Sequence, residues 1–222
     1  MFATLPALMP LPFAAKLWDL DGTLADTTGV YKRTAFEVAE RHDIGLTEQF
    51  WNSMPPGPPK VWLKELTDDQ DVIDRFCVAY GMRARELLAE HTKWNDGALE
   101  TVEKLHRKNI PQAIVTTART PSVEVMDRVL QFSRFINVII TGDHVDPNFK
   151  PEPHGLFMAA EQLGVEPSLC YYTGDFETDV MAAERAGMYK ILLRGAHTPE
   201  RALGLANLEV HNLRELHPHL NI

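Results

Sequence analysis

The chain has 222 residues, a length that suits one sizeable core with an insertion and is short for two full domains. Hydrophobic residues make up 45% and charged residues 24%, an ordinary balance for a soluble globular protein. The formal net charge of −9 provides no basic field for nucleic acid, and it does not steer anionic substrates, so local cations must bind any phosphate.

The N-terminal segment is apolar but is not typical of a targeting or membrane segment. Residues 1–13 contain Pro6, Pro10 and Pro12 and no basic residue. A secretory signal needs a basic start and an unbroken apolar stretch, and a membrane span needs about 20 apolar residues. We therefore interpret 1–13 as a loosely packed extension. Cys77 lies on a predicted helix and Cys170 in a predicted buried strand, so we expect no disulfide and a cytoplasmic location.

A pair of aspartates follows the first predicted strand. The apolar run 13–18 ends at Asp19, and Asp21, Gly22 and Thr23 come next. Two carboxylates this close repel each other unless a cation lies between them, and Mg²⁺ prefers carboxylate, carbonyl and water oxygens. Because the strand ends here, we expect the chain to curl and both acids to converge on one cation. A metal-free turn that caps a helix or closes a hairpin is the alternative.

The next part of the chain is predicted to be helical. Helical spacing marks residues 30–41, a stretch from about Val61, and a longer one over 71–90. Residues 53–60 are rich in proline and predict irregular structure. No strand pattern occurs between Thr27 and Trp94. The sequence therefore predicts a helical cap domain over 26–94, with hinges at 25–28 and 93–97.

From Asn95 onward, strand and helix patterns alternate, which favours a parallel sheet covered by helices on both faces. Apolar runs over 113–115 and 169–173 each stop at polar residues, and a lysine precedes Pro151, which is expected to start a helix. In an open α/β sheet, ligands bind beyond the carboxyl ends of the strands. Each polar residue alone has an ordinary structural interpretation, but together they predict one site. These residues are Thr116, Thr117, Lys150, Asp175 and Asp179.

With these motifs the sequence resembles the haloacid dehalogenase superfamily of phosphotransferases. Residues 19–23 are similar to its first motif, Thr116 to the second, Lys150 to the third, and Asp175 with Asp179 to the fourth. The resemblance runs from about Ala14 to the C-terminus and includes the phosphoglycolate phosphatase and β-phosphoglucomutase group. It implies a Rossmann-like, doubly wound parallel α/β core formed by residues 1–25 and 95–222, with the helical cap as an insertion of the C1 type.

The resemblance implies an aspartyl-phosphate mechanism that uses Mg²⁺. Asp19 is then the nucleophile and a metal ligand, and Asp21 is the general acid and base, with its backbone carbonyl on the metal. Asp175 is a further ligand. Asp179 either reaches the metal through water or is the partner of Lys150, and the sequence leaves both open.

The resemblance also implies which residues hold the substrate. Thr116, Thr117 and the backbone at the start of the following helix bind the transferring phosphoryl group, and Lys150 neutralises its charge. Lys60, three residues after Gly57 in the proline-rich segment, is the predicted cap contact to substrate. The alternative for Lys60 is an exposed lysine without a role.

The predicted function is Mg²⁺-dependent hydrolysis of a small phosphate monoester, such as a sugar phosphate or a phosphoglycolate-like molecule. Asp21 favours phosphorus chemistry, because a halide leaving group needs no acid. Tyr31 stands where the β-phosphoglucomutase pattern has a histidine. Trp51, Trp62 and Trp94 either line a pocket for an apolar leaving group or form the core of the cap.

Two alternatives remain open: a phosphomutase of the β-phosphoglucomutase type, and a non-catalytic binding or regulatory protein on the same fold. The expected partner is a small phosphorylated metabolite, with neither nucleic acid nor membrane. We expect the protein to be a monomer or a homodimer.

Overall fold

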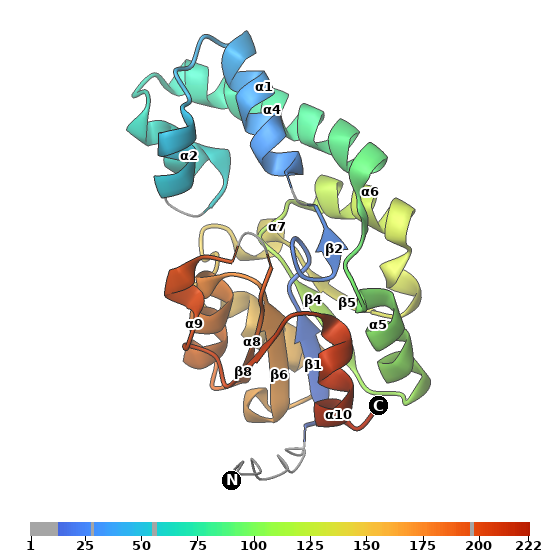
Figure 1. Cartoon of the computed structure of the whole chain (residues 1–222). Helices are drawn as coiled ribbons and strands as arrows, with labels where there is room; N and C mark the ends of the chain where they lie inside the picture. The colour runs from blue at the N-terminus through green and yellow to red at the C-terminus, as the bar shows by residue number, and fades with distance from the viewer. Residues whose placement is uncertain (1–12, 28, 55–56, 196–197) are drawn as a thin grey trace, which may run out of the picture.

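The computed structural model describes residues 13–27, 29–54, 57–195 and 198–222. Within them a parallel six-stranded sheet forms the centre of the core, in the order β5-β4-β1-β6-β7-β8 (Figure 1). Its central strand is β1, which pairs with β4 on one side and β6 on the other. The strands are β1 (Ala15–Trp18), β4 (Gln112–Val115), β5 (Val138–Ile140), β6 (Cys170–Gly174), β7 (Tyr189–Leu193) and β8 (Leu208–Val210).

Helices cover both faces of this sheet, as the alternation of strands and helices predicts (Figure 1). Leu17 of β1 packs in one apolar layer with α8 and α9, whereas Trp18 packs in the opposite layer with α5, α6 and α10. Successive strand residues point to opposite faces, so every residue of β1 is buried. The helices are α5 (Ala98–Arg107), α6 (Thr120–Leu130), α7 (Gly142–Val145), α8 (His154–Leu163), α9 (Glu177–Arg185) and α10 (His217–Leu220), with 3₁₀ turns η2 (Phe132–Arg134), η3 (Pro167–Leu169), η4 (Glu200–Ala202) and η5 (Leu213–Leu216).

A separate helical unit, here called the cap, lies above the carboxyl ends of the strands (Figure 1). It comprises α1 (Val30–Arg41), α2 (Glu48–Ser53), α3 (Pro59–Trp62), η1 (Leu63–Glu65) and α4 (Gln70–His91). The cap has its own apolar core, in which Trp62 is only 2% exposed and packs edge-to-face on Phe76 with 5.6 Å between ring centroids. Trp62 therefore belongs to the core of the cap.

Two short strands connect the cap to the core. Strand β2 (Ala25–Asp26) pairs antiparallel with β3 (Lys93–Trp94), and Lys93 forms an ion pair with Asp26 at 3.2 Å. The predicted domain boundaries fall on these strands. The expectation that no strand lies between Thr27 and Trp94 is wrong, because a strand of two residues is too short to leave an alternating pattern.

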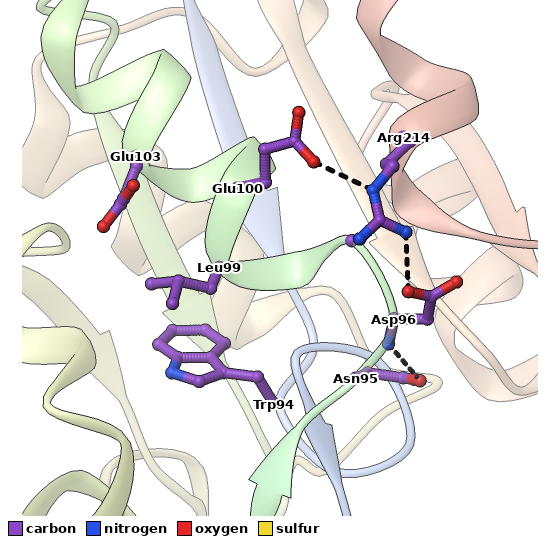
Figure 2. A pocket seen from close by; sticks show the side chains of 8 residues that line it. Trp94, Asn95, Asp96, Leu99, Glu100, Glu103 and Arg214 are labelled. Atoms are coloured by element: carbon purple, nitrogen blue, oxygen red, sulfur yellow. Dashed lines mark hydrogen bonds and ion pairs between the residues drawn. The ribbon is translucent and has the colours of Figure 1, made fainter.

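The core side of this hinge is held by the C-terminal part of the chain. Figure 2 shows a pocket of about 380 Å³ beside β3, in which Arg214 lies between Glu100 and Asp96. Arg214 donates hydrogen bonds to Glu100 (2.8 Å) and Asp96 (2.6 Å). The Asn95 side chain donates to the carbonyl of Gly22 at 2.8 Å, which ties the hinge to the loop that follows β1.

Three helix starts differ from the sequence prediction. The helix after Lys150 begins at His154 instead of Pro151, because the chain first makes a turn. Helix α3 already begins at Pro59, a residue favoured in a first helical turn, so the irregular segment is shorter than predicted. Helix α6 begins at Thr120, so a loop and not a helix follows Thr116 directly.

Of the predicted N-terminal extension, only Phe13 falls within the described residues, and its ring stacks on Tyr171 at 4.8 Å. Thr28 of the predicted first hinge is likewise outside them. None of the helices in the described ranges has the length and apolar character to cross a membrane.

Candidate active site

Asp19 lies at the centre of the carboxyl edge of the sheet. It follows β1 directly, and its backbone N–H donates to the carbonyl of Thr173 in β6 at 2.8 Å, which continues the parallel ladder by one residue. The residue is 5% exposed. Since strands β4 and β6 flank β1, polar residues at their ends lie beside the Asp19 carboxylate.

Lys150 connects the carboxylates of this edge. Its Nζ donates to Asp19 Oδ1 at 2.5 Å, to Asp179 Oδ1 at 2.6 Å and to the Tyr172 hydroxyl at 3.0 Å. Burial by itself lowers the pKa of the Lys150 ammonium, but Asp179 and Asp19 outweigh it and hold that pKa well above its ordinary value. Lys150 is therefore a charged, buried cation beside the predicted nucleophile.

Three carboxylates gather on the same side of the site. Ligand oxygens of Asp19, Asp175 and Asp179 all lie within 4.8 Å of one another. Thr23 donates to Asp175 Oδ1 at 3.3 Å, and the Phe176 N–H donates to Asp179 Oδ2 at 3.1 Å. Asp179 thus pairs with Lys150, one of the two roles that the sequence left open, and its role toward a metal stays a prediction.

The cluster carries more negative charge than Lys150 neutralises. Burial raises the pKa of Asp19 well above its ordinary value and, together with the charge of Asp179, raises the pKa of Asp175 to about 7. Ionising both carboxylates therefore costs free energy, because it adds charge to a buried site that is already anionic. A divalent cation removes this cost. The donors are all carboxylate oxygens, without sulfur or imidazole, which is the set that Mg²⁺ prefers.

Two glycines allow the carboxylates to come this close. Gly22 has a φ of +81°, and a Cβ there would overlap the carboxylate of Asp175. A Cβ on Gly174 would overlap the side chain of Asp179. Both positions need glycine for space, and Gly22 also needs it for its left-handed backbone.

Asp21 points away from the cluster toward the cap. Its carboxylate accepts hydrogen bonds from Thr27 at 3.1 Å and, weakly, from Thr116 at 3.5 Å. The expected convergence of both aspartate side chains on one cation is therefore not what the structure shows. Burial raises the pKa of Asp21, which the hydroxyls of Tyr31 and Thr27 partly offset. An acid whose pKa is raised holds a proton more readily near neutral pH, as a general acid must.

The loop after β4, which contains Thr116 and Thr117, forms another part of the site. Thr116 is 2% exposed, and its hydroxyl accepts from the N–H of Ala118 at 3.0 Å. Thr117 is exposed and lines a cavity of about 890 Å³ between the core and the cap, as does Asp21. The predicted phosphoryl-binding segment therefore faces this cavity as a loop.

Lys60 also lines the cavity, but its ammonium has a partner in the core. Its Nζ lies 2.9 Å from Asp146 Oδ2, and the Lys60 side chain is 45% exposed. Arg119 contacts the same Asp146 at 2.7 Å and Asp143 at 2.8 Å. A direct contact of Lys60 with substrate stays a prediction, and in this structure Lys60 links the cap to the core.

Sequence reasoning missed the role of Tyr172. In the sequence it is an aromatic residue in a buried strand, as β-structure commonly has. In the fold its hydroxyl lies 3.0 Å from Lys150 Nζ and 3.0 Å from Asp179 Oδ1. Sequence reasoning also missed Arg119, which pairs with Asp143 and Asp146. The available signal was its position three residues after Thr116 in a polar loop.

Comparison with known proteins places this site in a family. The model of the haloacid dehalogenase-like hydrolases matches residues 16–193, which span all four motifs. The chain belongs to the haloacid dehalogenase-like hydrolase family. The match begins within β1 and ends with β7, so it includes the cap as well as the catalytic edge of the sheet.

Relatives and solved structures agree with this assignment. The chain is 27% identical to validoxylamine A 7'-phosphate phosphatase of Streptomyces hygroscopicus subsp. limoneus, over 94% of this chain and 98% of that protein. It is 29% identical to a phosphorylated carbohydrates phosphatase of Thermotoga maritima, over 80% and 83%. The crystal structure of CbbY from Rhodobacter sphaeroides with phosphate shares the fold, with a TM-score of 0.84, 23% identity, and 95% and 100% coverage. Together these findings make the chain an enzyme, a phosphoric monoester hydrolase.

Proposed function

We propose that the protein hydrolyses a small phosphate monoester with the help of Mg²⁺, through an aspartyl-phosphate at Asp19. The observation that carries the proposal is the joint placement of two unlike acids. Asp19 is held by Lys150 beside two further carboxylates, whereas Asp21 lies outside that cluster and lines the cavity. One acid is thus placed to attack phosphorus and the other to move a proton.

The residues support a two-step reaction. In the first step Asp19 attacks phosphorus while Asp21 gives its proton to the leaving alcohol. In the second, Asp21 takes a proton from a water that attacks the acyl phosphate, which restores Asp19. Lys150 and the loop at Thr116 and Thr117 offset the charge of the phosphoryl oxygens in both steps.

Asp19, Asp175 and Asp179 are the side chains that would hold Mg²⁺, together with the backbone carbonyl of Asp21. The cation supplies charge neutralisation between the nucleophile and the phosphoryl group. The raised pKa values of Asp19 and Asp175 and the carboxylate-only donor set support this assignment.

The substrate class is part of the proposal. We expect a small phosphorylated metabolite, with sugar phosphates and phosphoglycolate-like esters as the starting candidates, because one relative is named a phosphorylated carbohydrates phosphatase and another, from Escherichia coli, a phosphoglycolate phosphatase. We expect the protein to act in the cytoplasm, as a monomer or homodimer, without nucleic acid or membrane. The two cysteines lie on different elements, Cys77 on α4 and Cys170 on β6, and are unpaired.

Phosphate release from a panel of primary-alcohol phosphate esters tests the proposal, with Mg²⁺ or with EDTA. We expect release only with Mg²⁺ and its loss in Asp19→Asn, which keeps the shape of the side chain. Asp69→Asn, an exposed aspartate that caps α4, is the matched control and should keep full activity. Phosphoryl exchange between sugar phosphates instead of release would identify a phosphomutase, and silence in both assays would identify a binding protein.

A further inference from the structure

The cap side of the cavity between core and cap is a wall rich in apolar and aromatic side chains. Among the described residues, the part of this wall contributed by the cap contains no carboxylate, amide, imidazole or aliphatic hydroxyl. A sugar presents several hydroxyls, and each one that is buried without a partner costs free energy. Apart from Lys60 and Arg85, the wall is made mainly of aromatic and aliphatic side chains, among them Trp51, Met54, Val78, Tyr80 and Met82.

Helix α4 presents part of this apolar wall uncovered. Cys77, Val78, Gly81, Met82 and Arg85 recur at the spacing of one helix face, and all of them line the cavity. Val78 is 65% exposed and Met82 55% exposed, although both are large apolar residues next to a catalytic site. A flat ring placed in the cavity would remove this apolar surface from water.

One cation of the cavity has no anionic partner. Lys60 pairs with Asp146, and Arg119 pairs with Asp143 and Asp146. Arg85 lines the same cavity, is only partly exposed, and forms no ion pair within the part of the chain that the structure describes. Its guanidinium is therefore available for an anionic group of a ligand.

We propose that the substrate is a phosphate monoester whose alcohol carries a flat apolar ring, packed against α4, and an acidic substituent that pairs with Arg85. This rests on the proposed function, since Asp21, the proposed general acid, lines the cavity and marks the end at which the phosphate would lie. Within the small phosphorylated metabolites of the proposed function, it favours ring-bearing acids over the sugar phosphates used as starting candidates. The Tyr31 and Tyr80 side chains line the same cavity as Asp21 and add to its aromatic surface.

The test compares esters of equal intrinsic reactivity, all of primary alcohols: 4-carboxybenzyl phosphate, benzyl phosphate and glucose 6-phosphate. We expect kcat/KM to fall in that order, with at least about tenfold between the carboxybenzyl and benzyl esters, the size of a charge-assisted contact. In Arg85→Gln this ratio should fall close to one, mainly through KM. Arg75→Gln, an exposed arginine of the same helix outside the cavity, is the control and should leave the ratio unchanged.

The outcomes separate this inference from the function on which it rests. Faster hydrolysis of glucose 6-phosphate than of both benzyl esters would overturn the inference and leave the phosphatase proposal intact. An unchanged ratio in Arg85→Gln would overturn the assignment of Arg85. Val78→Thr, which keeps the shape of the wall but makes it polar, should lower kcat/KM for both benzyl esters and not for glucose 6-phosphate. No hydrolysis of any ester would overturn both proposals.

Discussion

Without a metal, the protein should lose stability as the pH rises from 5 to 8. The cause is Asp175, whose pKa the fold raises from 3.8 to about 7, mainly by burial and then by the charge of Asp179. Between these two values the folded protein keeps a proton that the unfolded chain has released. Stability is therefore greatest below this window and is lost as the pH rises through it. Asp19, with its raised pKa, acts in the same direction.

The size of the stability change depends on the pH range of the experiment, which begins at pH 5 and therefore covers only part of the interval between 3.8 and about 7. The interval from pH 5 to the Asp175 pKa of about 7 is about two pH units, which corresponds to a loss of about 2.7 kcal/mol in the free energy of unfolding. Because Asp175 keeps some exposure to solvent, we expect about 2 kcal/mol. His217 acts in the opposite direction, since burial and Lys104 lower its pKa, and this contribution is the same with and without metal.

Urea unfolding at pH 5 and pH 8, in EDTA and in MgCl₂, measures this effect. The free energy of unfolding in EDTA should be lower at pH 8, and MgCl₂ should remove the difference because a bound cation favours the ionised carboxylates. Asp175→Asn should reduce both the pH effect and the response to MgCl₂, and the part that remains is due to Asp19. A metal-free protein equally stable at both pH values, or an Asp175→Asn variant that behaves like the parent, would refute the reasoning.

Three further predictions concern single side chains. Lys16 is fully buried in β1, where it donates to carbonyl and hydroxyl oxygens, and burial lowers its pKa well below the usual value. Lys16→Met should therefore raise the free energy of unfolding at pH 7 by about 1–3 kcal/mol, less toward pH 10; no gain in urea unfolding contradicts this. Asp146→Asn removes the charge that pairs with Arg119 and, across the cap–core contact, with Lys60; the exposed Lys60 pair is worth about 0.2–1 kcal/mol, so KM should rise by up to about fivefold at low salt and not at high salt. Tyr172→Phe removes one hydrogen-bond acceptor of Lys150 and should lower kcat about tenfold with little change in KM, whereas an unchanged kcat would show that the hydroxyl is dispensable.

Much of the catalytic edge was predictable because strand ends are visible in the sequence. Asp19, Thr116 and Asp175 each follow a short apolar run, and a parallel sheet brings the carboxyl ends of its strands together whatever their separation in the chain. Helix α1, at Val30–Arg41, was predictable for a similar reason, since one face of it is apolar at helical spacing.

Side-chain direction beyond the strand ends was not predictable. The Asp21 carboxylate accepts hydrogen bonds from Thr27 and Thr116, and Thr116 lies 95 residues away in the chain. The partner of Lys60 is equally remote, since Asp146 follows 86 residues later. The first contact depends on how two distant core segments meet and the second on how the cap sits on the core, and no local pattern in the sequence encodes either.

The central claim is that Asp19 itself carries the phosphoryl group during turnover. Rapid mixing of the protein with Mg²⁺ and a hydrolysed ester, acid quenching and mass spectrometry of the peptide that contains Asp19 test this directly. We predict a phosphorylated Asp19 peptide that forms and decays within one turnover and does not form in Asp19→Asn or in EDTA. Full hydrolysis without any phosphorylated peptide, or phosphorylation at another residue, would contradict the account.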